Sequence, residues 1–148
     1  LLSDSPGSKA CFHPVVTTEL SDPEKSAEAY AQTLKTFCKS DPPSFDLMLL
    51  GLGDDGHTAS LFPYSSSLDV SDSYTTVGYG KGQHRITLTH TVLSSAKKII
   101  FLISGSSKQK ALKRLIDPSE DCYRTPAKFV KSSTEILVLA DLPACELI

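Results

Sequence analysis

The sequence lacks several features that mark whole classes of proteins. It has no excess of basic residues, because 15 lysines and arginines stand against 17 acidic residues and the formal net charge is −2. Nucleic-acid and membrane-surface proteins depend on a strongly basic face. Apolar runs of about 20 residues, which a membrane span needs, are also missing, and residues 47–52 and 99–103 are only strand-sized. We therefore expect neither a nucleic-acid partner nor a membrane partner.

Metal-binding and secretory patterns are missing as well. The cysteines are spread along the chain, at Cys11, Cys38, Cys122 and Cys145. Without a C-x-x-C pair they favour free thiols in a reducing compartment, so the cytoplasm is the expected location. The opening residues reach Pro6 and Gly7 too soon for a secretory signal. Because the chain starts at Leu1 and not at Met, we expect residues 1–148 to be a single-domain fragment.

The first helix is predicted after Ser21-Asp-Pro-Glu24, which matches a capping box with proline in the first turn. Asp41-Pro-Pro43 should end it. Its apolar face follows helical spacing and comprises Ala27, Tyr30, Ala31, Leu34, Phe37 and Cys38. Further helical segments are predicted at residues 90–96, 107–116 and 142–148.

Three apolar runs have the length of buried strands, namely residues 45–52, 98–104 and 135–140. The first run is nearly continuous, which is typical of a strand covered on both faces. Two alternating runs, 74–79 and 85–89, predict a hairpin around Gly80-Lys-Gly82. Strands that alternate with helices indicate an α/β fold with a mainly parallel sheet.

Two loops leave the predicted strands in the direction where ligands bind in open α/β sheets, residues 51–60 and 105–108. The first loop carries Asp54, Asp55 and His57. Its imidazole could take a proton from water near neutral pH, and an adjacent carboxylate could orient the ring. There are two alternatives to a catalytic role: a metal site built on Asp-Asp-Gly-His, and a loop histidine with no function.

The second loop leads into a predicted helix, whose N-terminus presents free amides and partial positive charge. Lys108 in its first turn would suit a bound phosphate, and a solvated lysine is the alternative. Arg85 is either a surface charge or a contact to phosphate or carboxylate. The other cations of the second loop's helix are expected to be solvated, at Lys110, Lys113 and Arg114.

The motif Gly51-Leu-Gly-Asp-Asp-Gly-His57-Thr-Ala-Ser-Leu-Phe-Pro63 resembles the signature of the 6-phosphogluconolactonase family. Arg85-Ile-Thr-Leu-Thr89 and Gly105-Ser-Ser-Lys108 resemble further family segments in the same order, and Asp141 falls where the closing segment carries an aspartate. The resemblance implies a Rossmann-like fold and hydrolysis of a sugar-phosphate lactone to 6-phosphogluconate, without metal or cofactor.

By that resemblance, His57 would be the general base and Asp55 would shape its loop or ring. Substrate would be bound by five residues on the two loops and the hairpin: Lys108, Arg85, Gly53, Gly56 and Gly105. The related glucosamine-6-phosphate deaminases carry Asp-Gly-His followed by a further acidic residue, whereas here Thr58–Pro63 carries none. The lactonase interpretation is therefore favoured over an isomerase or deaminase.

The family pattern also opens with a Ser-Gly-Gly-Ser-Thr-Pro-like phosphate loop, and residues 1–43 have no match to it. We therefore expect the N-terminal half of the sheet to be missing. An uncovered strand edge tends to pair with another chain, so the fragment should pair with that half or self-associate. A sugar-phosphate-binding module without catalysis is the remaining alternative.

Overall fold

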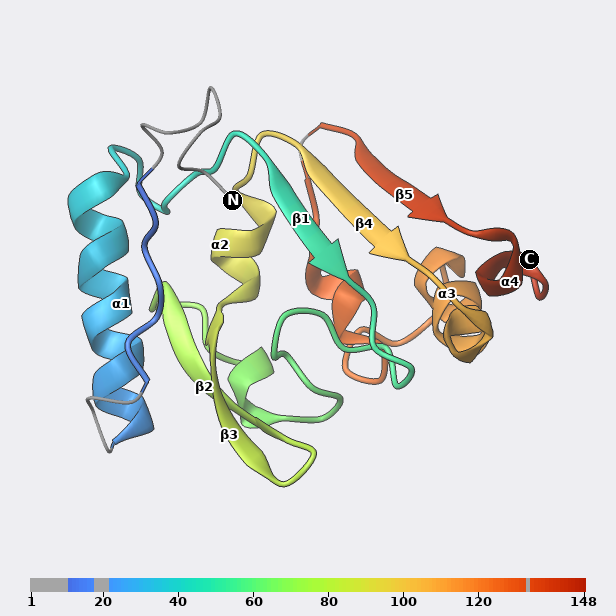
Figure 1. Cartoon of the computed structure of the whole chain (residues 1–148), viewed down its shortest axis with the longest axis horizontal. Coiled ribbons are helices and arrows are strands. Elements are labelled where there is room, and N and C mark those ends of the chain that lie inside the picture. The colour runs from blue at the N-terminus through green and yellow to red at the C-terminus, as the bar shows by residue number, and fades with distance from the viewer. Residues whose placement is uncertain (1–10, 18–21, 133) are drawn as a thin grey trace, which may run out of the picture.

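A three-stranded parallel sheet forms one half of the structure (Figure 1). The computed structural model describes residues 11–17, 22–132 and 134–148. The strand order is β1-β4-β5, with β1 at Met48–Gly51, β4 at Ile99–Ile103 and β5 at Ile136–Ala140. Because neighbours in this order are separated along the chain, each parallel pair is joined by a crossover that contains helix. The predicted α/β fold with a parallel sheet is confirmed.

The second sheet is the predicted antiparallel hairpin. It pairs β2 at Thr75–Gly80 with β3 at Gln83–Leu88. The two residues of the turn, Lys81 and Gly82, have φ values of 53° and 77°. Two positive φ values in a two-residue turn match the right-handed twist of the flanking strands. The hairpin therefore closes tightly and brings the Lys81 side chain to its tip.

Helix α1, Pro23–Phe37, packs against this hairpin. Its N-cap is Asp22, whose side chain accepts a hydrogen bond from the Glu24 amide, whereas the predicted cap Ser21 lies outside the described residues. The hydroxyl of Thr75 donates to the Ala27 carbonyl over 2.6 Å and ties the helix to β2.

One member of the predicted apolar face of α1 is misplaced. Ala27 and Leu34 are buried, but Phe37 is 62% exposed at the last turn of the helix. Its ring lies 4.1 Å from that of His13. The prediction was wrong for Phe37 because the helix ends there, beyond the reach of the hairpin.

The remaining predicted helices are confirmed as α2 at His90–Ser94, α3 at Gln109–Ile116 and α4 at Leu142–Cys145. Short 3₁₀ turns add Ser66–Leu68, Ser106–Lys108 and Pro126–Phe129. Buried residues of these segments share one apolar core with the inner face of the sheet, where Phe101 is 1% exposed. Within the described part of the chain, none of the helices has the length and apolar composition of a membrane span.

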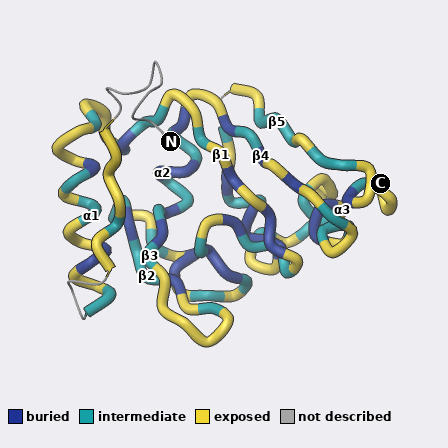
Figure 2. The backbone as a smooth tube through the Cα atoms, in the orientation of Figure 1, coloured by how far each residue is buried: buried dark blue, intermediate teal, exposed yellow. Residues whose placement is uncertain are grey.

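The opposite face of the parallel sheet is bare in the described structure. Leu49, Leu102 and Leu139 alternate with less exposed residues, which are buried in β1 and β4 and partly buried in β5, and the three leucines are 56%, 50% and 48% exposed. The burial colours of Figure 2 show this alternation along the strands. The expectation that the first strand is covered on both faces is therefore wrong for this part of the chain, because helices pack on one side only.

Candidate active site at the carboxyl ends of the strands

The loops that follow the three parallel strands meet at one edge of the sheet. The loop after β1 carries Asp55 and His57, and the loop after β4 carries Ser104 and Gly105. Asp141, which directly follows β5, accepts hydrogen bonds from the Ser104 hydroxyl over 2.6 Å and from the Gly105 amide over 3.0 Å. These bonds lower the pKa of the Asp141 carboxyl, the Ser104 bond most. The second loop is thus anchored to the end of its neighbouring strand.

Asp55 and His57 form a close pair on the first loop. One carboxylate oxygen, Oδ1, lies 2.6 Å from the ring Nδ1 and also accepts from the His57 amide at 3.0 Å. Burial raises the pKa of the Asp55 carboxyl, but the two hydrogen bonds and the charge of His57 together outweigh it, so the pKa is lowered.

An ionised carboxylate can only accept hydrogen bonds, so the proton between the two groups belongs to Nδ1 of His57. In a neutral imidazole the second nitrogen, Nε2, is then left with a lone pair. The side chain of His57 is 17% exposed, so the ring is not fully closed off from solvent. The pair therefore presents a proton acceptor whose orientation is set by Asp55.

The absence of a side chain at Gly53 makes room for this pair. A Cβ at that position would lie 2.0 Å from Nδ1 of His57 and 2.6 Å from Oδ1 of Asp55. The Gly53 amide also donates to the His57 carbonyl over 2.7 Å, which closes the loop on itself. Gly53 therefore has a packing role here, in addition to the predicted role in substrate binding.

Phe62 connects the histidine to the hairpin. Its ring centroid lies 4.7 Å from that of His57, and the guanidinium carbon of Arg85 lies 5.8 Å from the same ring. A Cβ at Gly80 would approach the Phe62 ring to 2.5 Å, so glycine allows the hairpin to pack here. Arg85 is exposed on β3, on the side of the hairpin that reaches this ring.

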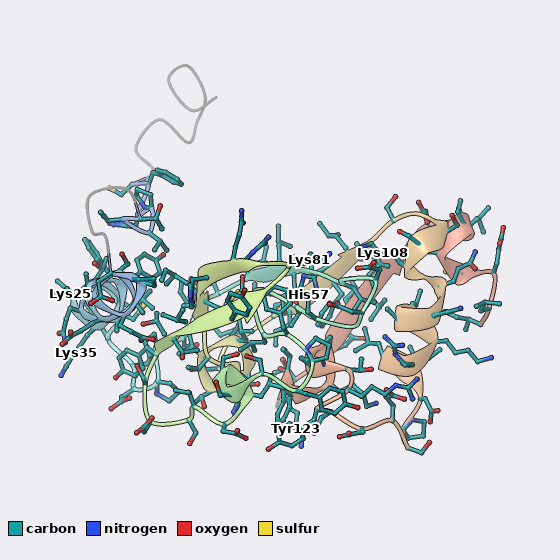
Figure 3. All side chains as sticks on the ribbon, turned by 90° about the horizontal axis from the view of Figure 1, so that it is seen from below. Lys25, Lys35, His57, Lys81, Lys108 and Tyr123 are labelled. Atoms are coloured by element: carbon teal, nitrogen blue, oxygen red, sulfur yellow. The ribbon has the colours of Figure 1, made fainter. Side chains whose placement is uncertain are left out.

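Two lysines from different elements share the charge environment of Asp54. Lys81, at the hairpin tip, lies 3.4 Å from Oδ1 of Asp54. Its charge is the largest cause of the lowered pKa of that carboxyl, and the charge of Lys108 acts in the same direction. Figure 3 shows Lys81, His57 and Lys108 gathered in one region, while Lys25 and Lys35 lie on α1 at the far end.

Sequence reasoning missed Lys81, which it treated only as part of a turn. Glycines at 78 and 80 on the preceding strand were the available signal, because glycine within a strand often marks a close approach of another segment. A Cβ at Gly78 would lie 2.1 Å from the Ser60 carbonyl oxygen, which confirms such an approach.

Lys108 lies at the predicted start of a helix. It ends the 3₁₀ turn that follows Gly105 and is the N-cap residue of α3, with no side-chain cap hydrogen bond. Gly105 has a φ of 95°, a conformation that favours glycine. The turn brings Lys108 to the same edge of the sheet as Asp54.

Arg114 does not lie on a solvated face. Its side chain is 21% exposed and its Nε donates to the Thr125 hydroxyl over 3.1 Å. Lys110 and Lys113 on the same helix are exposed, as expected. The prediction was wrong for Arg114 because the chain after α3 folds back beneath the histidine loop.

The alternative of a metal site gains no support from the geometry. Among the described residues, no group of three or more histidine, cysteine, aspartate or glutamate side chains is placed to hold an ion. The carboxylate of Asp55 is occupied by the histidine, and that of Asp54 by a lysine.

Comparison with known proteins settles the family. The sequence pattern that defines the glucosamine-6-phosphate isomerases and 6-phosphogluconolactonases matches residues 1–139. This chain belongs to that family. The chain is 43% identical over 141 residues to the 6-phosphogluconolactonase of Synechocystis, a match that covers 93% of this chain and 58% of the relative.

Solved structures of the family share the fold. A 6-phosphogluconolactonase from Shewanella baltica superposes with a TM-score of 0.78 at 25% identity, over 94% of this chain and 60% of that one. A monomeric glucosamine-6-phosphate deaminase superposes with a TM-score of 0.69 at 25% identity, over 87% of this chain and 56% of that one. The fold is thus common to both activities, and this chain spans little more than half the length of these proteins.

Proposed function

We propose that this chain carries the catalytic base of a 6-phosphogluconolactonase, which hydrolyses 6-phospho-D-glucono-1,5-lactone to 6-phosphogluconate in the oxidative pentose phosphate pathway. The observation that carries the proposal is the Asp55–His57 pair, in which Nδ1 of His57 lies 2.6 Å from Oδ1 of Asp55. We propose that the other ring nitrogen, Nε2, faces the substrate. The reducing compartment inferred from four free cysteines supports a cytoplasmic location.

In the proposed reaction, Nε2 of His57 removes a proton from water as the water oxygen bonds to the lactone carbonyl carbon. The bond from that carbon to the ring oxygen then breaks, and the imidazolium returns its proton to the departing oxygen. Asp55 keeps the ring oriented and stabilises its transient positive charge. General-base assistance of this kind is worth on the order of 10²–10⁴ in rate.

The substrate phosphate is the group that the nearby cations would bind. Lys108 lies beside the start of α3, and Lys81 faces it from the hairpin across Asp54. Arg85 stands further along β3, over the Phe62 ring. We propose that Lys108 and Lys81 contact the phosphate and that the backbone at Gly53, Gly56 and Gly105 lines the substrate.

A deaminase or isomerase is the second candidate, because such an enzyme shares the fold. The segment that follows His57 argues against it. Thr58, Leu61 and Phe62 are buried, and the Thr58 hydroxyl donates to the Gly51 carbonyl over 2.8 Å. This segment supplies packing and no carboxylate, whereas proton transfer between carbon atoms needs further acid–base groups.

The decisive experiment compares His57→Ala with His84→Ala in a lactone hydrolysis assay corrected for the uncatalysed reaction. His84 is an exposed histidine whose ring packs on Tyr79. We expect kcat to fall roughly a hundredfold or more for His57→Ala only. Equal rates for the two variants would refute the base assignment, and binding of 6-phosphogluconate without turnover would identify a binding module.

We also propose that the bare sheet face binds a polypeptide segment equivalent to the part of the relatives that this chain does not match. Parallel sheets are normally covered on both faces, and here three half-exposed leucines line one of them. Without such a segment, a second copy of the chain should take its place, and turnover should be at least a hundredfold slower than that of a full-length relative, because substrate is poorly positioned.

Sedimentation of the chain tests this pairing. We expect self-association of the chain alone, weakened when Leu49, Leu102 and Leu139 are all replaced by threonine. Leu142→Gln is the matched control, because Leu142 is 87% exposed on α4. Co-expression with the unmatched segment of the Synechocystis relative should restore a monomeric complex. A monomeric chain that hydrolyses the lactone at the rate of that relative would contradict the proposal.

A further inference from the structure

The histidine loop rests on a buried threonine from a distant part of the chain. Thr125, between α3 and the 3₁₀ turn at Pro126–Phe129, is fully buried. The Ala127 amide donates to the Gly56 carbonyl over 3.1 Å. Gly56 has a φ of 96°, and a Cβ there would lie 3.0 Å from the methyl carbon of Thr125. The backbone between Asp55 and His57 is therefore pressed against Thr125.

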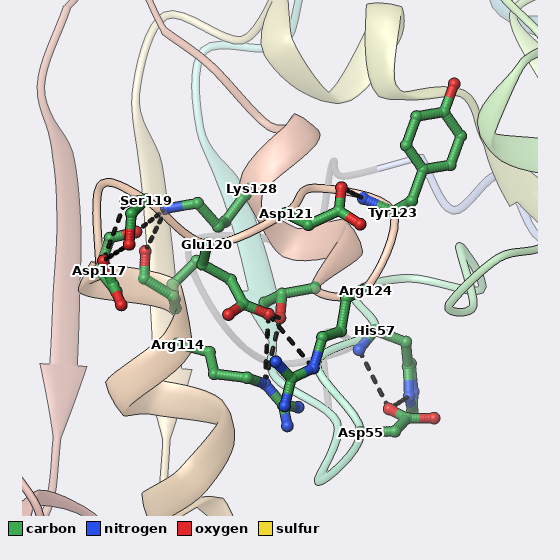
Figure 4. Close-up of polar contacts among 12 residues, drawn as sticks. Asp55, His57, Arg114, Asp117, Ser119, Glu120, Asp121, Tyr123, Arg124 and Lys128 are labelled. Carbon is green, nitrogen blue, oxygen red and sulfur yellow. Dashed lines mark hydrogen bonds and ion pairs between the residues drawn. The ribbon is translucent and has the colours of Figure 1, made fainter.

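The hydroxyl of Thr125 is fixed by two charged side chains. It donates to Oε1 of Glu120 over 2.7 Å and accepts from Nε of Arg114 over 3.1 Å. Its donor and acceptor are both used, so the side chain is held in one rotamer with the methyl group toward Gly56. Figure 4 shows Arg114 and Glu120, the partners of this hydroxyl, in the same close-up as the Asp55–His57 pair.

Glu120 is the centre of this cluster. Its side chain is 9% exposed and lies 3.7 Å from Nε of both Arg114 and Arg124. Burying a carboxylate is costly unless cations and hydrogen-bond donors surround it, and Glu120 has both kinds of partner here. Arg114 also reaches the loop directly, because its Nη2 lies 3.3 Å from the position a Cβ would take at Gly56.

We propose that Arg114, Glu120 and Thr125 form a positioning network that holds Gly56, and with it the Asp55–His57 pair, in the catalytic geometry. The role of this network in catalysis rests on the proposed function, whereas its restriction of the loop backbone at Gly56 does not depend on that function. Gly56 separates the two members of the pair, and glycine alone does not restrict its own backbone. The network supplies that restriction from outside the loop, so its members are positioning residues and do not touch substrate.

A matched pair of variants separates the hydrogen bonds from the packing. Thr125→Val keeps the methyl contact and removes the hydroxyl, whereas Thr125→Ser keeps the hydroxyl and removes the methyl. In Thr125→Val we expect the pKa of the Asp55 carboxyl, followed by NMR, to rise toward its ordinary value. Exchange of the Ala127 amide should become about tenfold faster, the factor for losing one net hydrogen bond. Thr125→Ser loses the methyl contact but keeps both hydrogen bonds, so both readouts should change less than in Thr125→Val.

Thr75→Val is the control for general destabilisation, because it removes the hydroxyl of another buried threonine, on β2. It should leave the Asp55 titration and the Ala127 exchange unchanged. If Thr125→Val does not fold, Glu120→Gln keeps an acceptor for Thr125 without the charge and should shift both readouts in the same direction. A Thr125→Val protein with wild-type values, or equal shifts in Thr125→Ser or in Thr75→Val, would overturn the proposal.

These readouts need no turnover, so they are independent of whether His57 is the base. If His57→Ala proved fully active, the proposed function would fail while the network could still be tested. In a chain or complex that turns over lactone, Thr125→Val should lower kcat about tenfold with KM changed less than twofold, since the network acts on the loop and not on the substrate contacts.

Discussion

Asp55 should contribute to catalysis in two separable ways, through the position of the ring and through charge. Its Oδ1 accepts from both the amide and the ring of His57. Because one oxygen makes both contacts, Asp55→Asn can preserve them with its amide oxygen and lose only the negative charge. Asp55→Ala removes the contacts as well. The two variants therefore predict a graded loss of activity.

The size of each step follows from the hydrogen bond that changes. A bond to a charged group contributes about 1.5–3 kcal/mol and a neutral one about 0.5–1.5 kcal/mol. Losing the charge alone should cost about 1–1.5 kcal/mol of transition-state stabilisation, roughly tenfold in kcat. Losing the whole charged bond at 2.6 Å should lower kcat by about a hundredfold. KM should change little, because Asp55 does not face the proposed phosphate contacts.

Two measurements test this grading. Initial rates of lactone hydrolysis, corrected for the spontaneous reaction, give kcat, and nitrogen NMR of the imidazole shows which ring nitrogen carries the proton. The Nδ1–H form should dominate in wild type and in Asp55→Asn, and lose its preference in Asp55→Ala. Asp46→Ala is the control, because Asp46 pairs with Lys97 and precedes β1, at the end of that strand away from the ring. A kcat for Asp55→Ala within twofold of wild type would refute the reasoning.

Three further predictions concern neighbouring residues. Lys108→Ala should weaken 6-phosphogluconate binding by about 1–3 kcal/mol in calorimetry. The control Lys110→Ala, at an exposed lysine of the same helix, should leave binding unchanged. An unchanged Kd for Lys108→Ala would mean that Lys108 is a solvated surface lysine without a role in binding. Gly53→Ala should abolish the Asp55–His57 contact and lower kcat at least tenfold, because the added Cβ would overlap the His57 ring. The control Gly51→Ala should keep wild-type kcat, because the space around a Cβ at that position is open. The lowered folded pKa of Asp55 means that its ionised form stabilises the fold above about pH 4 and that this contribution disappears as the pH falls through the folded value. The unfolding free energies of wild type and Asp55→Asn, measured by urea titration, should therefore converge between about pH 5 and pH 2, and a constant difference would argue against the shift.

The parts of the site that follow directly from strands could be predicted from the sequence. Apolar runs located β1 and β4, and the chain direction in a parallel sheet then placed residues 51–60 and 105–108 at one edge. The adjacency of Asp55 and His57 is a local property of a glycine-rich loop, so it too could be foreseen. These inferences needed only local pattern and one topological rule.

Contacts made by tertiary folding could not be predicted in the same way. Lys81 reaches Asp54 only because the hairpin folds back over Phe62, and the sequence separation of 27 residues gives no indication of this. Arg114 has the spacing of a solvated helical residue, yet the chain at Thr125 returns to cover it. Helical periodicity predicts which side of a helix is apolar. It does not predict that a later segment will bring the carboxylate of Glu120 to Arg114 on the polar side.

The bare sheet face shows that an apolar run can correctly predict a strand and still give a wrong expectation of how many of its faces are covered. The run 45–52 has apolar residues on both sides of the strand, as a doubly covered strand would. In the described structure the helices cover only the side of Leu50, and Leu49 is more than half exposed. The apolar pattern fits a strand with a layer on each face, while the described residues place helices on one face only. The exposed Leu49 beside the buried Leu50 therefore supports the proposed partner layer on the bare face, a layer that the described residues do not provide.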